Sequence, residues 1–124
     1  MFRTSIILLT AALAALVAGS GASGRPAAIP TLRGTVGPSF TITLKRNGKR
    51  VTSLKAGRYR IVVTDKASAH NFELEQESGG KFERDLTNVA FVGTKSATVT
   101  LKKGKWKYYC EPHEATMFGV FRVK

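Results

Sequence analysis

Apolar and polar residues alternate in several short stretches of the chain, and turn residues separate these stretches. One run covers Phe40–Leu44, whose apolar residues alternate with two threonines, and another covers Tyr59–Asp65. Successive side chains of a strand point to opposite faces, so a period of two predicts a half-buried strand in both places. Further strands are predicted at Val89–Val92 and at Val99–Leu101.

Turn residues mark the ends of these strands. Asn47-Gly48 predicts a tight hairpin, because both central positions of such a turn take a positive φ, which Asn and Gly tolerate. Gly79-Gly80 lies in a polar stretch that predicts a longer loop. Beyond the N-terminal segment, no window carries the apolar stripe of an amphipathic helix. Many short strands with regular turns in about 100 residues predict an all-β protein, a Greek-key β-sandwich or barrel.

Residues 1–22 have the three parts of a secretory signal peptide: Arg3 near the start, an apolar run over Ile6–Ala18, and small residues after it. The thirteen residues of this run are fewer than the roughly 20 that a membrane-spanning helix needs, which argues against a permanent anchor. Cleavage is expected after Ser20 or Ala22. Residues 23–30 would then form a disordered leader, and residues 31–124 one domain that is secreted or periplasmic.

The residues with metal chemistry concentrate in the segment 108–119. It holds the only cysteine of the chain, Cys110, together with His113 and Met117, and the other histidine, His70, lies forty residues before Cys110. A thiolate, two imidazoles and a thioether are the ligands of a blue-copper centre, in which the methionine is the long, weak axial ligand. Ligation would also protect an unpaired cysteine in an oxidising compartment.

With these residues the chain resembles the cupredoxins, the small blue copper proteins that include plastocyanins, pseudoazurins and azurins. The resemblance covers about residues 31–124 and rests on the order His70, Cys110, His113, Met117, with a proline between the cysteine and the second histidine. It implies that these four residues bind one copper ion, which alternates between Cu(I) and Cu(II) in a cupredoxin-type sandwich. It further implies a carrier of single electrons between redox partners that is not an enzyme.

Other interpretations of the same residues remain. The chain could be a copper-free sandwich, or it could bind zinc if Glu111 or Glu114 took the place of the methionine, since structural zinc usually takes four Cys or His ligands. A copper-buffering or copper-delivery protein could use the same ligand set. Met117 is the only methionine after the predicted signal peptide, which favours a carrier, because a delivery protein usually shows further exposed Met or His.

The strand before the cysteine is expected to alternate between core and surface. Trp106 and Tyr108 should face the core, and Lys105, Lys107 and Tyr109 should face outward. The resemblance implies that Tyr109 is the exposed tyrosine beside the cysteine that offers electrons a second, more remote entry. Acidic residues surround this tyrosine in plastocyanins, so lysines at these positions would invert the charge.

Two further expectations come from the resemblance. Asn71 occupies the position whose side chain ties the two ligand loops together, and Glu111 stands where its usual Ser or Thr partner would be. His113 should emerge through an apolar patch at which a redox partner docks. The patch would consist of Pro112, Ala115 and Phe118.

The chain is strongly basic, with 20 Lys and Arg residues against eight Asp and Glu residues and a net charge of +12. A charge of this size attracts anionic partners and speeds association with them. We therefore expect a redox protein with an acidic docking surface, although a solvated surface adapted to an anionic envelope would explain the charge as well. Export argues against nucleic acid as the partner, and the protein is expected to be a monomer.

Overall fold

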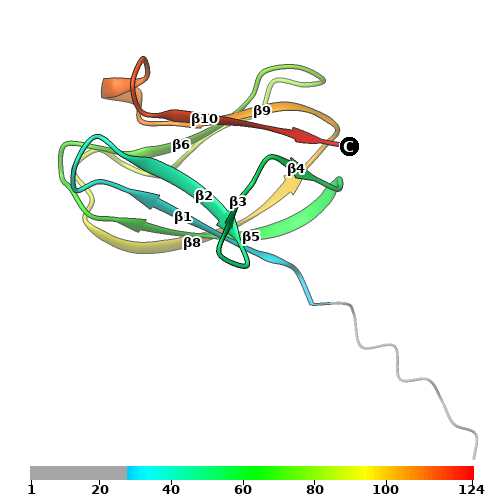
Figure 1. The fold of residues 1–124 in the computed structure, drawn as a ribbon, viewed down its shortest axis with the longest axis horizontal. Coiled ribbons are helices and arrows are strands. Elements are labelled where there is room, and N and C mark those ends of the chain that lie inside the picture. Colours follow the sequence, from blue (N-terminus) through cyan, green and yellow to red (C-terminus); the bar gives the residue numbers. More distant parts are fainter. Residues whose placement is uncertain (1–27) are drawn as a thin grey trace, which may run out of the picture.

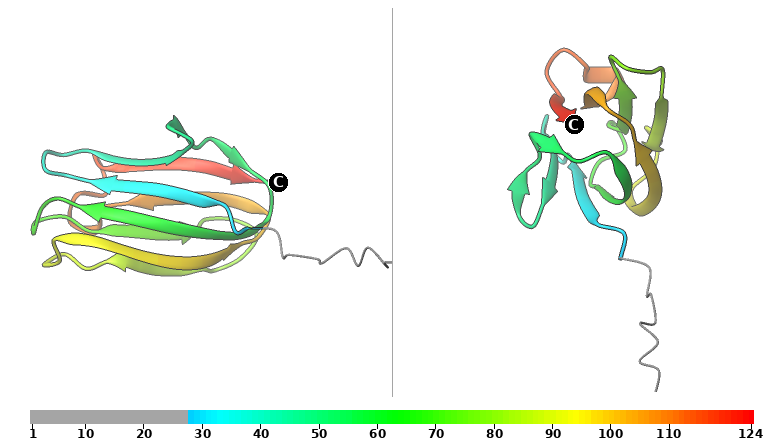
Figure 2. Two further views of the ribbon diagram at one scale, coloured as in Figure 1. Left: turned by 90° about the horizontal axis from the view of Figure 1, so that it is seen from below. Right: turned by 90° about the vertical axis from the view of Figure 1, so that its right-hand side faces the viewer.

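Two five-stranded sheets face each other in the computed structural model, which describes residues 28–124 (Figures 1 and 2). The first sheet has the order β3-β2-β1-β5-β8, and the second has the order β4-β10-β9-β6-β7. The strands are β1 (Thr31–Val36), β2 (Ile42–Arg46), β3 (Lys49–Arg50), β4 (Ser53–Leu54), β5 (Gly57–Asp65), β6 (Phe72–Gln76), β7 (Glu83–Thr87), β8 (Gly93–Leu101), β9 (Gly104–Tyr109) and β10 (Phe118–Val123). One 3₁₀ helix, η1 (Glu111–His113), lies between β9 and β10. The predicted all-β sandwich is confirmed.

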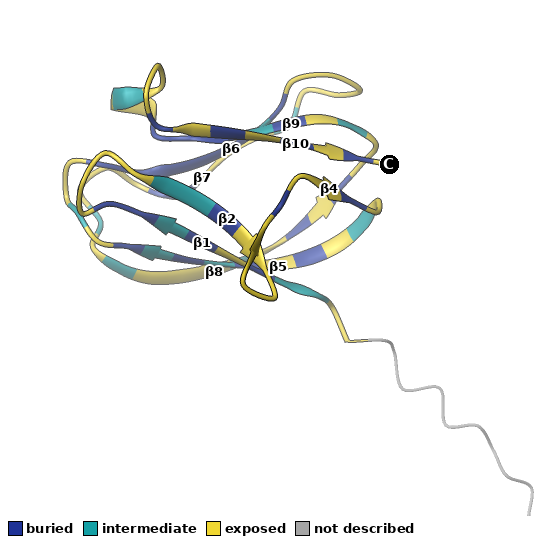
Figure 3. Ribbon diagram, viewed as in Figure 1, coloured by how far each residue is buried: buried dark blue, intermediate teal, exposed yellow. Residues whose placement is uncertain are grey.

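The core lies between the two sheets, and alternate residues along the strands point into it (Figure 3). In β5 the alternation buries Tyr59, Ile61 and Val63, as the period of two predicted. In β9 it buries Trp106 and Tyr108 completely. Burying such large apolar side chains is the main favourable contribution to the folding of a domain of this size.

The order of the strands brings two distant loops to one end of the sandwich. The chain passes from β5 in the first sheet to β6 in the second, and β9 pairs with both β6 and β10. The start of β6 and the end of β9 are therefore neighbours, with Glu73 opposite Tyr109. Figure 1 shows the β5–β6 connection, the β1–β2 connection and η1 gathered at this end.

The hairpin between β2 and β3 turns at Asn47 and Gly48, whose φ values of 50° and 77° match the predicted turn. The loop with Gly79-Gly80 joins β6 to β7, also as predicted. One glycine has a packing role: a Cβ at Gly119 would lie directly against the ring and hydroxyl of Tyr108, its cross-strand neighbour. The absence of a side chain at Gly119 is what admits the tyrosine ring to the core.

One predicted strand is wrong, and another begins two residues later than predicted: the run Phe40–Leu44 is a strand only from Ile42 onward. Phe40 is not an inward-facing strand residue, because the chain turns after Gly37 and β2 begins only at Ile42, so Phe40 lies exposed in the β1–β2 loop. The segment Val89–Val92 forms a turn and loop between β7 and β8, in which Phe91 N–H donates to the Asn88 carbonyl. Val89–Val92 has the composition of a strand but pairs with no other strand among the described residues, whereas Ile42–Leu44 pairs with β1.

The predicted signal peptide, its cleavage positions and most of the leader lie outside the described residues. Within residues 28–124, no helix has the length and apolar character needed to cross a membrane.

Candidate metal centre

The loops at one end of the sandwich place His70, Cys110 and His113 together. His70 lies near the end of the β5–β6 connection, two residues before β6, and Cys110 follows the last residue of β9. His113 is the last residue of η1. The pairing of β6 with β9 therefore brings together three side chains that come from segments forty residues apart.

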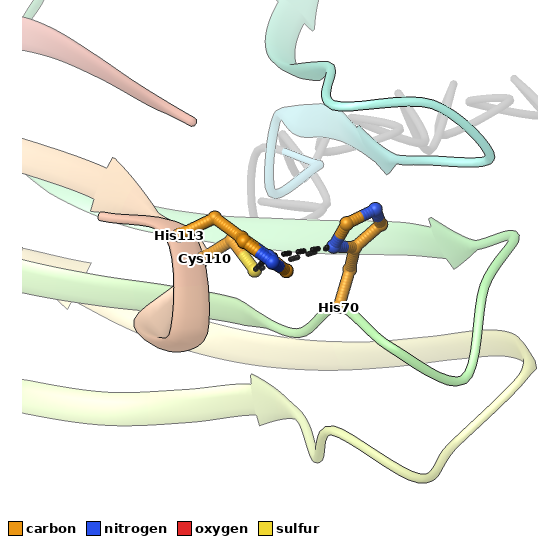
Figure 4. A group of neighbouring side chains, drawn as sticks. All are labelled: His70, Cys110 and His113. Carbon is orange, nitrogen blue, oxygen red and sulfur yellow. Dashed lines mark hydrogen bonds between the residues drawn. The ribbon is translucent and has the colours of Figure 1, made fainter. Parts of the chain in front are cut away.

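The donor atoms of these three residues converge on one point (Figure 4). His70 Nδ1 and His113 Nδ1 are 3.1 Å apart, and Cys110 Sγ lies 3.7 Å from the first nitrogen and 3.6 Å from the second. Cys110 and His70 are buried, whereas His113 is partly exposed. Three lone-pair donors that face one another in a buried space fit a shared metal ion, which would satisfy all of them at once. Two imidazoles and a thiolate are the trigonal set that suits copper.

Backbone hydrogen bonds close the loop that carries two of these residues. Cys110 N–H donates to the Met117 carbonyl at 3.0 Å, and Met117 N–H donates to the His113 carbonyl at 2.8 Å. His113 N–H in turn donates to the Cys110 carbonyl at 3.1 Å. Pro112 restricts φ within η1 and has no N–H that would need a partner. The loop thus brings the Met117 backbone beside that of Cys110, and the methionine side chain is buried.

Asn71 ties the two loops together, as the resemblance implied. Its buried side-chain Oδ1 accepts a hydrogen bond of 2.7 Å from the backbone N–H of Glu111. Because the donor is a backbone group, the tie does not depend on a Ser or Thr at position 111. Bonds of this kind orient metal ligands and tune the metal that they hold.

Phe40 also lies at the site, although nothing in the sequence pattern predicted it there. Its ring meets both imidazoles edge to face, with centroids 5.4 Å from His70 and 4.9 Å from His113. The side chain is 65% exposed, so it covers the histidines while offering an apolar surface to solvent. The position of Phe40 follows from the turn after Gly37, and nothing in the local alternation of residues indicates it.

The expectation of an exposed Tyr109 is wrong. The residue does face outward from β9, but it is only 5% exposed, because its neighbours on that face cover it. Its hydroxyl donates to Glu83 Oε1 at 3.1 Å, and Lys107 Nζ lies 5.1 Å from its ring centroid. Burial is the main cause that raises the pKa of Tyr109 far above its usual value, and the nearby carboxyl of Glu73 adds to the effect.

The two lysines predicted to face outward beside this tyrosine, Lys105 and Lys107, are both paired with carboxylates. Lys107 Nζ lies 2.8 Å from Glu114 Oε1, and Lys105 Nζ lies 3.4 Å from Glu77 Oε2. The local charge is therefore mixed, and the tyrosine itself contacts an acidic residue. Strand alternation predicted correctly which side chains face outward, but the acidic partners come from other segments.

A structure of the copper protein rusticyanin matches with a TM-score of 0.56 at 18% identity, over 76% of each chain. A reduced Cu(I) form of an amicyanin mutant matches with a TM-score of 0.52 at 15% identity, over 80% of this chain and 87% of that one. At this identity the likeness shows the fold. No curated protein sequence matches the chain. The model of the copper binding proteins of the plastocyanin/azurin family matches residues 38–124, so the chain belongs to that family.

Proposed function

We propose that this protein is a mononuclear type 1 copper protein that carries single electrons between larger redox proteins, in the periplasm or outside the cell. The observation that carries the proposal is the convergence of two imidazole nitrogens and one thiol sulfur within 3.7 Å, at one end of a β-sandwich. Family membership supports copper as the metal. The ligands are His70, Cys110 and His113, with Met117 as the weak axial ligand.

This ligand set suits a one-electron carrier. Copper, when bound, supplies a Cu(I)/Cu(II) couple; soft sulfur ligands favour the reduced ion, and imidazole suits both. The protein contributes a site that cannot rearrange much, because backbone bonds between Cys110, His113 and Met117 close the loop. The Asn71 side chain fixes that loop to the segment of His70.

Electrons would enter and leave on the side of His113. His70 is buried, whereas His113 is partly exposed and is flanked by the exposed ring of Phe40. An apolar surface beside the partly exposed ligand lets a partner approach closely without desolvating charged groups. Phe40 joins Pro112 and Ala115 as an exposed residue of this surface.

An acidic partner remains part of the proposal, but a different basic surface supports it. On the outer face of the first sheet, Arg33 and Lys45 are exposed cross-strand neighbours. Among the described residues neither takes part in an ion pair, whereas Lys105 and Lys107 both do. Unpaired basic side chains contribute more to long-range attraction than paired ones.

Copper loading tests the function directly. The copper-loaded protein should show an intense visible band from thiolate-to-copper charge transfer. Cys110→Ser should abolish it, since serine nearly preserves the shape but removes the thiolate. Thr116→Ala, in the same loop but outside the ligand set, is the matched control and should keep the band. A Cys110→Ser protein with the same colour would contradict the assignment. Retention of copper during repeated redox cycles in the presence of a Cu(I) chelator would separate a carrier from a delivery protein.

The charge of the partner can be tested by stopped-flow kinetics with small redox complexes. Reaction with the anion hexacyanoferrate(III) should slow as salt rises, because the screening length falls from about 10 Å at 0.1 M to about 3 Å at 1 M. The reaction with a cationic cobalt(III) complex should instead become faster as salt rises, because salt screens the repulsion between like charges. Arg33→Glu with Lys45→Glu should slow the reaction with the anion more than Lys105→Glu with Lys107→Glu. Equal salt responses with both complexes would show that the basic surface does not steer partners.

A further inference from the structure

A group of three carboxylates lies on the outer face of the second sheet, apart from the His–Cys–His group. Glu73 belongs to β6, Asp85 to β7, and Glu111 to the start of η1. One oxygen atom from each lies within 4.8 Å of the others. Three acidic side chains from three segments gather here although basic residues outnumber acidic ones 20 to eight in the chain.

A bulge in the sheet produces this arrangement. The register between β6 and β7 shifts between Phe72 and Glu73, so that Glu73 lies directly opposite Asp85. A bulge re-aims side chains in this way. On its other side Glu73 lies opposite Tyr109 of β9. Like charges directly opposite each other destabilise a sheet, so a positive charge between the two carboxylates would stabilise this pairing.

The burial of Glu73 is an independent indication that this group of carboxylates binds a ligand. Its side chain is only 6% exposed, and its Oε2 has no hydrogen-bond partner among the described residues. Neither of the ion pairs formed within residues 28–124 includes Glu73, Asp85 or Glu111. A buried charged oxygen without a partner is costly, and native structures normally provide one.

Protonation is the alternative way to relieve this cost. Burial, followed by the neighbouring carboxyl of Glu83, raises the pKa of Glu73 to about 8, while the Tyr109 hydroxyl acts in the opposite direction. Asp85 also raises it. A proton on Glu73 would remove one charge, but it would leave Asp85 and Glu111 beside each other without a counter-charge. A cation shared by all three would satisfy the whole group.

We propose that Glu73, Asp85 and Glu111 form a second cation site that binds a divalent ion with a preference for hard oxygen ligands, Ca²⁺ ahead of Mg²⁺. Oxygens separated by up to 4.8 Å can share an ion at the Ca²⁺–oxygen distance of about 2.3–2.6 Å, whereas the Mg²⁺ distance of about 2.0–2.1 Å would require the group to contract. Asp85 and Glu111 are exposed, so water can complete the coordination. With only three protein ligands, we expect the weak affinity of extracellular modules, about 10⁻⁴–10⁻³ M.

Such an ion would join the copper loop to the sheet. Glu111 follows Cys110 directly, and its backbone N–H is already bound to Asn71. Coordination by its side chain would connect η1 to β6 and β7 as well. The site therefore gives the protein a means by which external Ca²⁺ stabilises the loop that carries two of the three converging residues.

Calorimetric titration of the reduced, copper-loaded protein with CaCl₂ tests the proposal, and a NaCl titration at matched ionic strength corrects for screening. A saturable signal with one Ca²⁺ per protein is expected, with at least tenfold weaker binding of Mg²⁺. Glu73→Gln and Asp85→Asn should each weaken Ca²⁺ binding at least tenfold. Glu75→Gln removes one negative charge from the same strand and outer face without removing a ligand, and it should change the affinity less than twofold.

Terbium luminescence gives a second measurement that does not depend on heat signals. Tb³⁺ replaces Ca²⁺ in oxygen sites, and Tyr109, opposite Glu73, is placed to transfer excitation energy to it. Luminescence excited through tyrosine should appear on Tb³⁺ addition, decline when Ca²⁺ competes, and be lost in Glu73→Gln. Absence of saturable Ca²⁺ binding up to 10 mM would overturn the proposal and would mean that a proton alone relieves Glu73. Equal binding by Glu75→Gln, Glu73→Gln and wild type would overturn it too, because the signal would then be non-specific.

Discussion

Replacing Glu73 by glutamine should change how the stability of this protein depends on pH. Gln has nearly the shape of a protonated Glu but cannot ionise, so it isolates the effect of one titrating group. The pKa of Glu73 is raised from 4.5 to about 8, chiefly by burial and then by the carboxyls of Glu83 and Asp85, against the Tyr109 hydroxyl. The folded protein therefore keeps a proton that the unfolded chain releases above about pH 4.5.

The sign and size of the effect follow from this difference. A raised pKa means that the contribution of Glu73 to stability is fully present below about pH 4.5 and is lost as the pH rises toward 8. The loss is at most about 1.4 kcal/mol per pH unit, so wild type should lose roughly 2–3 kcal/mol relative to Glu73→Gln between pH 5 and pH 7. The two proteins differ only at position 73, so the contributions common to both cancel in the difference between their unfolding free energies.

Urea unfolding of both proteins at pH 5, 6 and 7, in buffer freed of divalent ions, measures this difference. Glu77→Gln is the matched control, because it alters an exposed carboxylate whose ion pair with Lys105 is worth at most about 1 kcal/mol. If the free-energy difference between wild type and Glu73→Gln stayed constant across the three pH values, the reasoning about this buried carboxyl would be refuted. Millimolar Ca²⁺ should flatten the pH dependence of the wild type, since the ion replaces the proton.

Three further substitutions test the metal loop and the packing around it. Met117→Leu should keep a coloured copper site with a raised reduction potential, as expected when a weak axial thioether is removed; complete loss of copper would show that Met117 is a principal ligand. Tyr108→Phe should leave the urea midpoint unchanged or raise stability by about 1 kcal/mol, because the Tyr108 hydroxyl is buried without a partner among the described residues; a clear loss of stability would reveal an unseen partner. Gly119→Ala should cost about 1–3 kcal/mol of unfolding free energy, since its Cβ would press on the Tyr108 ring; a neutral result would mean that the ring can move.

Features that depend on local sequence could be predicted correctly. The period of two identified β5 and the alternation of β9, because a strand's side chains alternate whatever lies around it. Asn47-Gly48 identified its hairpin, because positive φ at both positions is a property of those residues themselves. The candidate ligands could be named because only cysteine supplies a thiolate and only histidine an imidazole, and the chain has one cysteine and two histidines.

Tertiary structure decided the features that arise from pairing between distant segments. Phe40 covers the two histidines because of a turn and a neighbouring loop, although its alternation with Ile42 is that of a strand. Tyr109 faces outward as predicted, yet side chains from other strands bury it. The carboxylates of Glu73 and Asp85 meet only because a bulge shifts the register of two strands. Register and bulges are set by long-range contacts, so the chemistry that they assemble cannot be deduced from any one stretch of sequence.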